Sequence, residues 1–254
     1  MAFSFATAGA SGIALLARSS ISDTTDLVRA AARKADKSEP KIVEVKCDTT
    51  SEKEVEVAAE TIKSAFAGKL DVLVNNAGYL EDFKAVADSD PSEWWKSWEV
   101  NIKGTYLMSR AFLPLVLASD LKTLLIITSM GGLATSWGAS AYQVSKMAQM
   151  RLVEFLDVEY GEKGLLAMSV HPGGVPTELA KGMPKEMQDR ILNDKPEMAG
   201  DTVVWVCGGE GGERGERREW LKGRFVSSKW DMEELEAKRE EIVEEGLLKL
   251  QMRV

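Results

Sequence analysis

Histidine and cysteine are almost absent from this chain of 254 residues, which contains only His171, Cys47 and Cys207. A disulfide framework needs several paired cysteines, and a structural zinc site usually takes four histidine or cysteine ligands. The composition therefore excludes a disulfide-rich fold, and we expect no metal centre. Two isolated cysteines also indicate a reducing compartment, so we expect a cytoplasmic protein.

Excess positive charge and long apolar runs are also missing. The formal net charge is −8 and the isoelectric point is about 5.0, which disfavours binding to nucleic acid. No apolar run reaches the roughly 18–20 residues that a membrane-spanning helix needs. The small, apolar residues 1–17 carry no basic residue, unlike a secretory signal peptide. A mitochondrial transit peptide is the closer alternative, but we expect this segment to belong to the fold.

Short apolar runs alternate with longer amphipathic stretches over the first 170 residues. The runs predict strands over 13–17, 41–46, 70–74, 122–128 and 165–170. The stretches predict helices over 23–35, 51–67, 91–107 and 139–160. Because the strands are apolar throughout, this order predicts an α/β, Rossmann-like three-layer αβα sandwich with a mostly parallel sheet.

The chain after Ala180 has a weaker pattern. It predicts a loop and short helix over 182–196, a strand over 222–228 and a charged helix over 232–250. The low-complexity run GGEGGERGERR (208–218) predicts a flexible charged loop. Since no linker separates a second domain, we expect a single domain over 1–254. It would comprise a core over 1–206, the loop over 207–219, and the last strand and helix over 220–254.

Tyr142 and Lys146 are four residues apart on a predicted helix and therefore share one face. A tyrosine has an ordinary pKa of about 10, and a nearby cation lowers it. The pair could therefore supply a general acid or base, although a tyrosine and a lysine on a helix surface would give the same spacing. Ser129 favours the first interpretation, because it follows a buried strand at the sheet edge where ligands bind.

These residues, in their order and spacing, resemble the catalytic residues of the short-chain dehydrogenase/reductase family. The resemblance covers residues 12–179. It rests on the tetrad Asn101, Ser129, Tyr142 and Lys146, on Asn75-Asn76-Ala77-Gly78, on Asp48, and on Pro172-Gly173 with Val175 and Thr177.

The resemblance implies a role for each of these residues. Tyr142 would donate or accept the proton, while Lys146 would lower the tyrosine pKa and hold the nicotinamide ribose. Ser129 would orient the substrate oxygen, and Asn101 would support a proton relay through water. Asp48 would contact the adenine, and the segments 75–78 and 172–177 would line the rest of the cofactor site. The substrate would be a small alcohol or carbonyl compound.

The glycine-rich phosphate loop of this family has no full counterpart here. Of its three glycines only Gly12 falls in register, and residues 13–18 predict a strand rather than a helix. Residues 2–11 then predict the end of a first helix and its turn, so the first strand is missing or replaced. Residues 2–7 could act as a surrogate strand, or a partner chain could fill the gap. We favour a start that is truncated relative to the working protein.

Arg18 follows the first predicted strand at a position where an acidic residue binds the ribose of NAD and an arginine suits the 2′-phosphate of NADP. We therefore expect NADP(H) to be favoured over NAD(H), with a surface arginine as the alternative.

Two functions of different class follow from this sequence. The first is an NADP(H)-dependent oxidoreductase. The second is a catalytically silent or truncated protein of the same fold that acts as a scaffold or oligomer partner. By resemblance we also expect a homodimer or homotetramer that pairs through the helices carrying Trp98 and Tyr142.

Overall fold

The structure is a computed structural model that describes residues 1–208 and 217–252. In these residues all strand pairing is parallel, as predicted. The strands are β1 (Gly12–Ala17), β2 (Lys41–Lys46), β3 (Val72–Asn75), β4 (Thr123–Ile127), β5 (Leu166–His171) and β6 (Phe225–Ser227). The predicted flexible loop lies, over residues 209–216, outside the described residues.

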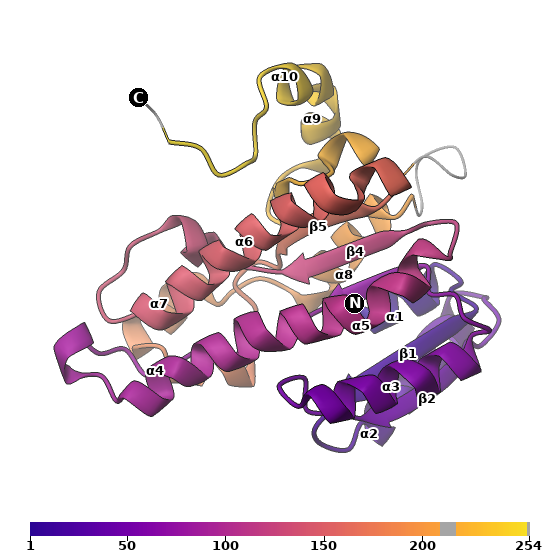
Figure 1. The fold of residues 1–254 in the computed structure, drawn as a ribbon, viewed down its shortest axis with the longest axis horizontal. Coiled ribbons are helices and arrows are strands. Elements are labelled where there is room, and N and C mark those ends of the chain that lie inside the picture. Colours follow the sequence, from indigo (N-terminus) through magenta and orange to yellow (C-terminus); the bar gives the residue numbers. More distant parts are fainter. Residues whose placement is uncertain (209–216, 253–254) are drawn as a thin grey trace.

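Helices cover both faces of the sheets (Figure 1). The longer ones are α2 (Ser22–Lys34), α3 (Glu52–Ala65), α4 (Pro91–Trp98), α5 (Thr105–Leu117), α6 (Ser140–Tyr160) and α8 (Pro196–Val206). The shorter ones are α1 (Ala2–Thr7), α7 (Lys185–Ile191), α9 (Met232–Ala237) and α10 (Arg239–Glu244). The α/β prediction is confirmed, and most predicted bounds lie within two or three residues of those observed.

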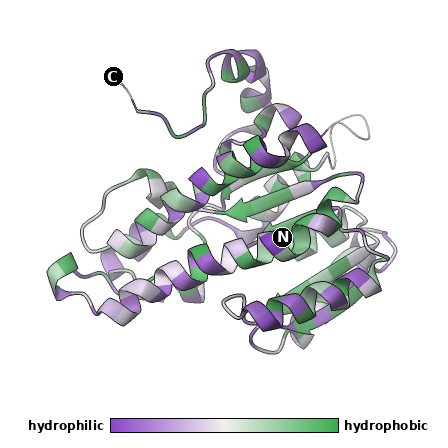
Figure 2. Ribbon diagram, viewed as in Figure 1, coloured by the Kyte–Doolittle hydropathy of each residue, from purple (hydrophilic) through white to green (hydrophobic). Residues whose placement is uncertain are grey.

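The side chains of β4 divide the core into two layers. Leu124 and Ile126 pack with residues of α3, α5 and α6, whereas Leu125 and Ile127 pack with residues of α8 and the C-terminal segment. This alternation follows from the two-residue period of a strand. It explains why β4 is buried at every position and why its ribbon is hydrophobic beyond Thr123 (Figure 2).

The strands form two separate sheets, β1–β2 and β3–β4–β5–β6. Within the described chain, no strand pairs with β1 or β3 on its other edge. Residues 2–7 form helix α1, so the alternative of a surrogate strand is wrong and the predicted helix end is correct. Helix α1 packs against α2 and α8, and Ala6 is fully buried there.

The C-terminal segment differs from its prediction. The expected helix over 232–250 is two short helices, α9 and α10, followed by an irregular segment. Gly246 and Leu248 both have positive φ values, +64° and +63°, which end the helical path. The pattern of charged pairs predicted a helix that is too long. It could not show that side chains elsewhere in the fold bind the backbone of this segment.

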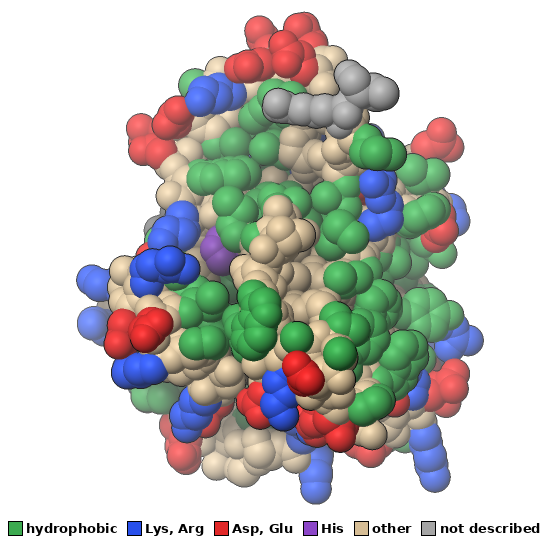
Figure 3. All heavy atoms as spheres, turned by 90° about the vertical axis from the view of Figure 1, so that its left-hand side faces the viewer, with side chains coloured by type: hydrophobic (Ala, Val, Ile, Leu, Met, Phe, Trp, Pro, Cys, Tyr) green, Lys and Arg blue, Asp and Glu red, His purple; other side chains and the backbone are tan. Residues whose placement is uncertain are grey.

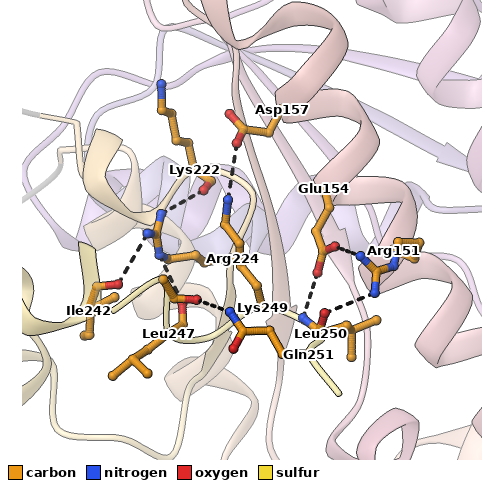
Figure 4. A network of polar contacts seen from close by, with 11 residues as sticks. Arg151, Glu154, Asp157, Lys222, Arg224, Ile242, Leu247, Lys249, Leu250 and Gln251 are labelled. Atoms are coloured by element: carbon orange, nitrogen blue, oxygen red, sulfur yellow. Dashed lines mark hydrogen bonds and ion pairs between the residues drawn. The ribbon is translucent and has the colours of Figure 1, made fainter. Parts of the chain in front are cut away.

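Those backbone partners are side chains of α6 and of the segment before β6 (Figure 4). The buried Arg224 donates to the carbonyl oxygens of Leu247 and Ile242, at 3.1 and 3.3 Å. Glu154 accepts a hydrogen bond from the backbone N–H of Leu250 at 2.8 Å, and Arg151 donates to the Leu250 carbonyl. The chain end is thereby held along α6. Among the described residues, no helix is both long and apolar enough to cross a membrane.

Candidate active site

The predicted site residues follow the carboxyl ends of neighbouring parallel strands. Asn75 ends β3, Ser129 comes two residues after β4, and Pro172 follows β5 directly. Ligands of open α/β sheets bind at this edge. Figure 3 views the molecule from this side, where hydrophobic side chains gather near the centre and charged side chains lie mostly around them.

A turn of π-helix, η2 (Glu99–Gly104), places Asn101 in the middle of the α4–α5 helical run. The amide of this fully buried residue accepts from the backbone N–H of Tyr79 at 2.8 Å and donates to the Tyr79 carbonyl at 2.9 Å. Its amide nitrogen also donates to Ser145 Oγ at 2.9 Å. Asn101 thus ties the loop after β3 to helix α6. Single π-turns often mark functional sites, and the sequence showed only a continuous helix here.

Tyr142, Lys146 and Ser129 meet at the start of α6. Ser129 and Tyr142 interact through their hydroxyl groups, and the Lys146 ammonium lies 5.6 Å from the centre of the Tyr142 ring. Lys146 is 3% exposed and donates to the Ile127 carbonyl at 2.9 Å. The turn η3 (Met130–Leu133) holds Ser129 in place, because Ser129 Oγ accepts from the Gly131 backbone N–H at 3.0 Å.

Burial dominates the acid–base properties of this pair. Desolvation raises the pKa of Tyr142 to about 12, and the charge of Glu81 adds to this while the hydrogen bond with Ser129 opposes it. Desolvation alone lowers the pKa of Lys146 to about 7. The lysine can therefore exchange its proton near neutral pH.

The space beside Gly78 fits the nicotinamide ribose of the cofactor that the fold implies. A methyl group built on Gly78 would lie 3.5 Å from Asn101 Oδ1 and 3.7 Å from Lys146 Nζ, and 3.2 Å from the Leu179 side chain. Glycine therefore keeps this corner open. The ammonium group has three N–H donors, and the contact with Ile127 uses one, so two are left for the hydroxyl groups of a sugar.

The described residues do not form a binding site of the family type for the pyrophosphate of that cofactor. A family-type cradle needs a glycine loop between a strand and a helix N-terminus. Here residues 8–11 form the turn between α1 and β1, with Gly9 at φ +86°, and Gly12 is the first residue of β1. No phosphate contact is therefore assigned to this turn.

Arg18 and Asp48 lie apart from the tyrosine, after β1 and β2. Asp48 accepts two hydrogen bonds from Thr50, at 2.9 and 2.8 Å, and its pKa is lowered mainly by the one from the Thr50 backbone. Arg18 and Lys103 lower that pKa further by their charges. The exposed Arg18 and the half-buried Asp48 therefore interact electrostatically.

The segment after β5 is anchored by Asp194. Its carboxylate accepts from the Gly174 backbone N–H at 2.7 Å and pairs with Lys229 at 2.9 Å. Gly174 is packed so closely that a methyl group would collide with the Ile191 carbonyl. Of the other residues predicted in this segment, Pro172, Gly173 and Val175 are half-buried and Thr177 is exposed.

Two of the predicted cofactor contacts, one at the end of β3 and one in the loop after it, differ in their exposure. The Asn75 amide is buried and donates to Ser109 Oγ at 3.0 Å, so it faces helix α5. Ala77 is exposed. Sequence reasoning missed two buried polar residues near the tetrad, Glu81 and Gln149. Gln149 lies three residues after Lys146, so helical spacing could have identified it. No spacing in the sequence relates Glu81 to the tetrad.

Comparisons with known proteins agree with this geometry. The family described as short chain dehydrogenase matches residues 1–188. Short chain dehydrogenase mpl6 of Monascus purpureus is 43% identical over 251 residues, which cover 99% of this chain and 83% of that protein. Short chain dehydrogenase pigC of Monascus ruber is also 43% identical, over 98% of this chain and 80% of its own length.

Solved structures show the same fold at lower identity. The 3-ketoacyl-(acyl-carrier-protein) reductase from Brucella melitensis, complexed with NADH, superposes with a TM-score of 0.73 at 23% identity and covers 89% of each chain. A putative short chain dehydrogenase from Escherichia coli CFT073, complexed with NADPH, gives 0.72 at 24% identity and covers 90% of each chain.

Proposed function

Because the chain belongs to the short-chain dehydrogenase family, we propose that it is an NADP(H)-dependent oxidoreductase that acts on a small alcohol or carbonyl compound through Tyr142. The observation that carries this proposal is the convergence of Tyr142, Ser129 and the buried Lys146 at the carboxyl edge of the sheet. A buried ammonium beside a phenol is costly for folding, which supports a chemical role for the pair.

Each side chain then has a part in the reaction. Tyr142 gives its proton to the carbonyl oxygen during reduction, or takes it from the alcohol during oxidation. The Ser129 hydroxyl holds that oxygen beside the tyrosine. Lys146 binds the ribose hydroxyls with its two remaining N–H donors and, when protonated, lowers the pKa of Tyr142. When bound, the nicotinamide supplies or accepts the hydride.

Asn101 organises the route by which Tyr142 regains its proton. Its side chain joins the loop after β3 to α6, and Asn101 Oδ1 and Lys146 Nζ approach the same corner at Gly78. Water in that corner would connect the lysine to solvent. The Asn101 carbonyl accepts from Gln149 at 2.7 Å, which satisfies a backbone group near the π-turn.

The Arg18 position supports a preference for NADP(H). The arginine is exposed after β1 and acts electrostatically on Asp48, and an arginine fork matches a phosphate group better than a sugar hydroxyl. NADH and NADPH both occur in complexes of structural relatives, so this preference depends on Arg18 alone.

Turnover of a panel of aldehydes, ketones and quinones, followed as loss of NADPH absorbance, tests the proposal. Tyr142→Phe should lower kcat at least about 100-fold, because general acid catalysis contributes roughly 10²–10⁴-fold. Tyr160→Phe, at the other end of the same helix, is the matched control and should retain activity. Full activity of Tyr142→Phe would show that another group moves the proton.

A catalytically silent scaffold of the same fold is the second candidate, and the turn at residues 8–11 favours it because it provides no pyrophosphate cradle. This function predicts a folded chain that binds neither NADPH nor NADH and turns over no member of the panel. The same experiments therefore separate the two functions.

A further inference from the structure

Helix α6 begins without a local cap, although it carries both Tyr142 and Lys146. Its N-cap residue is Ala139, which has no side-chain acceptor, and its first turn contains no acidic residue. By contrast, Ser51, Asp90 and Asp231 cap α3, α4 and α9 with their own side chains. The first amide groups of a helix have no partner within it. The backbone N–H of Tyr142 is one of these groups.

A carboxylate from a distant loop supplies the missing acceptor. Glu81 Oε1 accepts from the Tyr142 backbone N–H at 3.0 Å, across 61 positions in sequence. Its other oxygen, Oε2, accepts from the Ser97 hydroxyl of α4 at 2.6 Å. Glu81 is 4% exposed and Ser97 is fully buried. A buried carboxylate that accepts two hydrogen bonds from two different helices is a fixed part of the structure.

A second contact joins the same two helices beside it. Trp94 on α4 donates its indole N–H to the Ser140 hydroxyl at the first turn of α6, at 3.0 Å. The start of α6 is therefore held by α4 at Ser140 and by Glu81 at Tyr142. Trp94 also stacks on Trp98 of the same helix, with ring centres 6.0 Å apart.

We propose that Glu81 is the positioning residue for Tyr142, capping α6 so that the tyrosine hydroxyl stands at Ser129, and that the charge of its carboxylate also acts on that hydroxyl. This inference rests on the proposed function, because it assigns Glu81 a part in the use of Tyr142 as an acid or base. Glu81 itself touches neither substrate nor cofactor in this role.

Three groups lie around Tyr142. Ser129 shares a hydrogen bond with its hydroxyl from the loop after β4, Lys146 lies beside the ring on α6, and Glu81, in the loop after β3, accepts from its backbone N–H. The negative charge of Glu81 raises the pKa of Tyr142, and the Ser129 hydrogen bond lowers it. A neutral residue of the same shape at position 81 should therefore make the phenol more acidic.

Two variants distinguish the positioning of Tyr142 from the effect of the Glu81 charge. Glu81→Gln keeps an oxygen for the Tyr142 N–H and can donate to Ser97 through its amide, but it removes the charge. Glu81→Ala removes both. Glu60→Gln, on an exposed side chain of α3, is the control for loss of an acidic charge.

Hydrogen exchange of the Tyr142 amide, measured by NMR, tests the position without any substrate. Glu81→Ala should increase this exchange rate at least tenfold, whereas Glu81→Gln and Glu60→Gln should leave it within about threefold of the wild-type rate. If Glu81→Ala folds and the Tyr142 exchange rate is unchanged, Glu81 does not cap α6 and the proposal is wrong.

The pH dependence of kcat tests the charge. In Glu81→Gln the limb that reports Tyr142 should move to lower pH by about half a unit or more, because removal of the negative charge favours the phenolate. In Glu81→Ala, kcat should fall about 10- to 100-fold with the cofactor KM unchanged, as expected when the tyrosine is displaced while the groups that bind the cofactor stay in place.

An unchanged pH profile in Glu81→Gln would overturn the electrostatic half of the proposal. Failure of the proposed function is distinguishable from this, since it appears as no turnover by the wild-type protein or as full turnover by Tyr142→Phe, whatever the exchange rate of the Tyr142 amide.

Discussion

Lys146 holds an ammonium group where almost no solvent reaches it. Burial lowers its pKa from 10.5 to about 7 in the folded protein, while the unfolded chain keeps the ordinary value. Between these two pH values the unfolded state binds the additional proton, so the free energy of unfolding rises with pH across this window. The cost of charging the buried lysine is present in full below pH 7 and disappears above about pH 10.5.

Lys146→Met should therefore stabilise the protein most at acidic pH. We expect the free energy of unfolding at pH 6 to rise by about 2–4 kcal/mol, less than the full shift implies because the hydrogen bond to Ile127 is removed. The gain should shrink toward pH 10. Urea denaturation at pH 6, 8 and 10 measures this, with the exposed Lys63→Met as control. If the gain in the free energy of unfolding is the same at all three pH values, burial of the charged Lys146 does not destabilise the protein.

At the residue scale, the sequence pointed to the candidate catalytic side chains but not to the residues that position them. Tyr142, Lys146 and Ser129 were found because their spacing places them on one helix and at one strand end. Glu81 reaches Tyr142 through a loop, and the path between them depends on how α4 packs against α6. No local periodicity encodes such a contact.

Helix α6 also presents an unpartnered apolar stripe on its outer side. Val144, Met147, Phe155 and Val158 are between 40% and 79% exposed, at successive spacings of three or eight residues that keep them on one face. Trp95 and Tyr106, on the neighbouring α4 and α5, are also more than half exposed. Members of the family commonly form oligomers, and we infer that this stripe is where two copies of the chain pair.

The pairing of two copies can be tested by light scattering after size-exclusion chromatography. The wild-type chain should elute at twice its mass of 27.8 kDa or more. Replacement of Phe155 and Val158 by glutamate should give a monomer, because two buried charges would face each other across the pair. Leu27→Glu, on the exposed side of α2, should leave the mass unchanged. A monomeric wild-type chain would rule out this interface.

Elements with strong periodicity were predicted well, and those defined by tertiary contacts were not. The predicted strand over 41–46 has the observed bounds of β2. The π-turn around Asn101 and the break between α9 and α10 were missed. At the π-turn a partner distant in sequence, Gln149, takes up the Asn101 carbonyl. Arg224 does the same for the Ile242 carbonyl near the end of α10, where the predicted helix stops.

The whole molecule brings the predicted tetrad together at the carboxyl edge of the sheet but has an atypical turn where the family has its phosphate loop. The sequence predicted both: the tetrad from its spacing, and the lack of a cradle from the position of Gly12. It could not predict the packing of α1 against α2 and α8, because this packing depends on residues far apart in sequence, such as Ser4 and Gly200, which lie against each other.

The central claim is that this site binds a nicotinamide dinucleotide despite the atypical turn at residues 8–11. The most direct measurement is a titration of the folded protein with NADPH and with NADH, followed by energy transfer from its seven tryptophans to the reduced nicotinamide.

Binding of both cofactors is predicted, with NADPH the tighter ligand. We expect Arg18→Glu to weaken NADPH binding about tenfold or more, equivalent to roughly 1.4 kcal/mol, and to leave NADH binding nearly unchanged. A folded protein that bound neither cofactor would contradict the account.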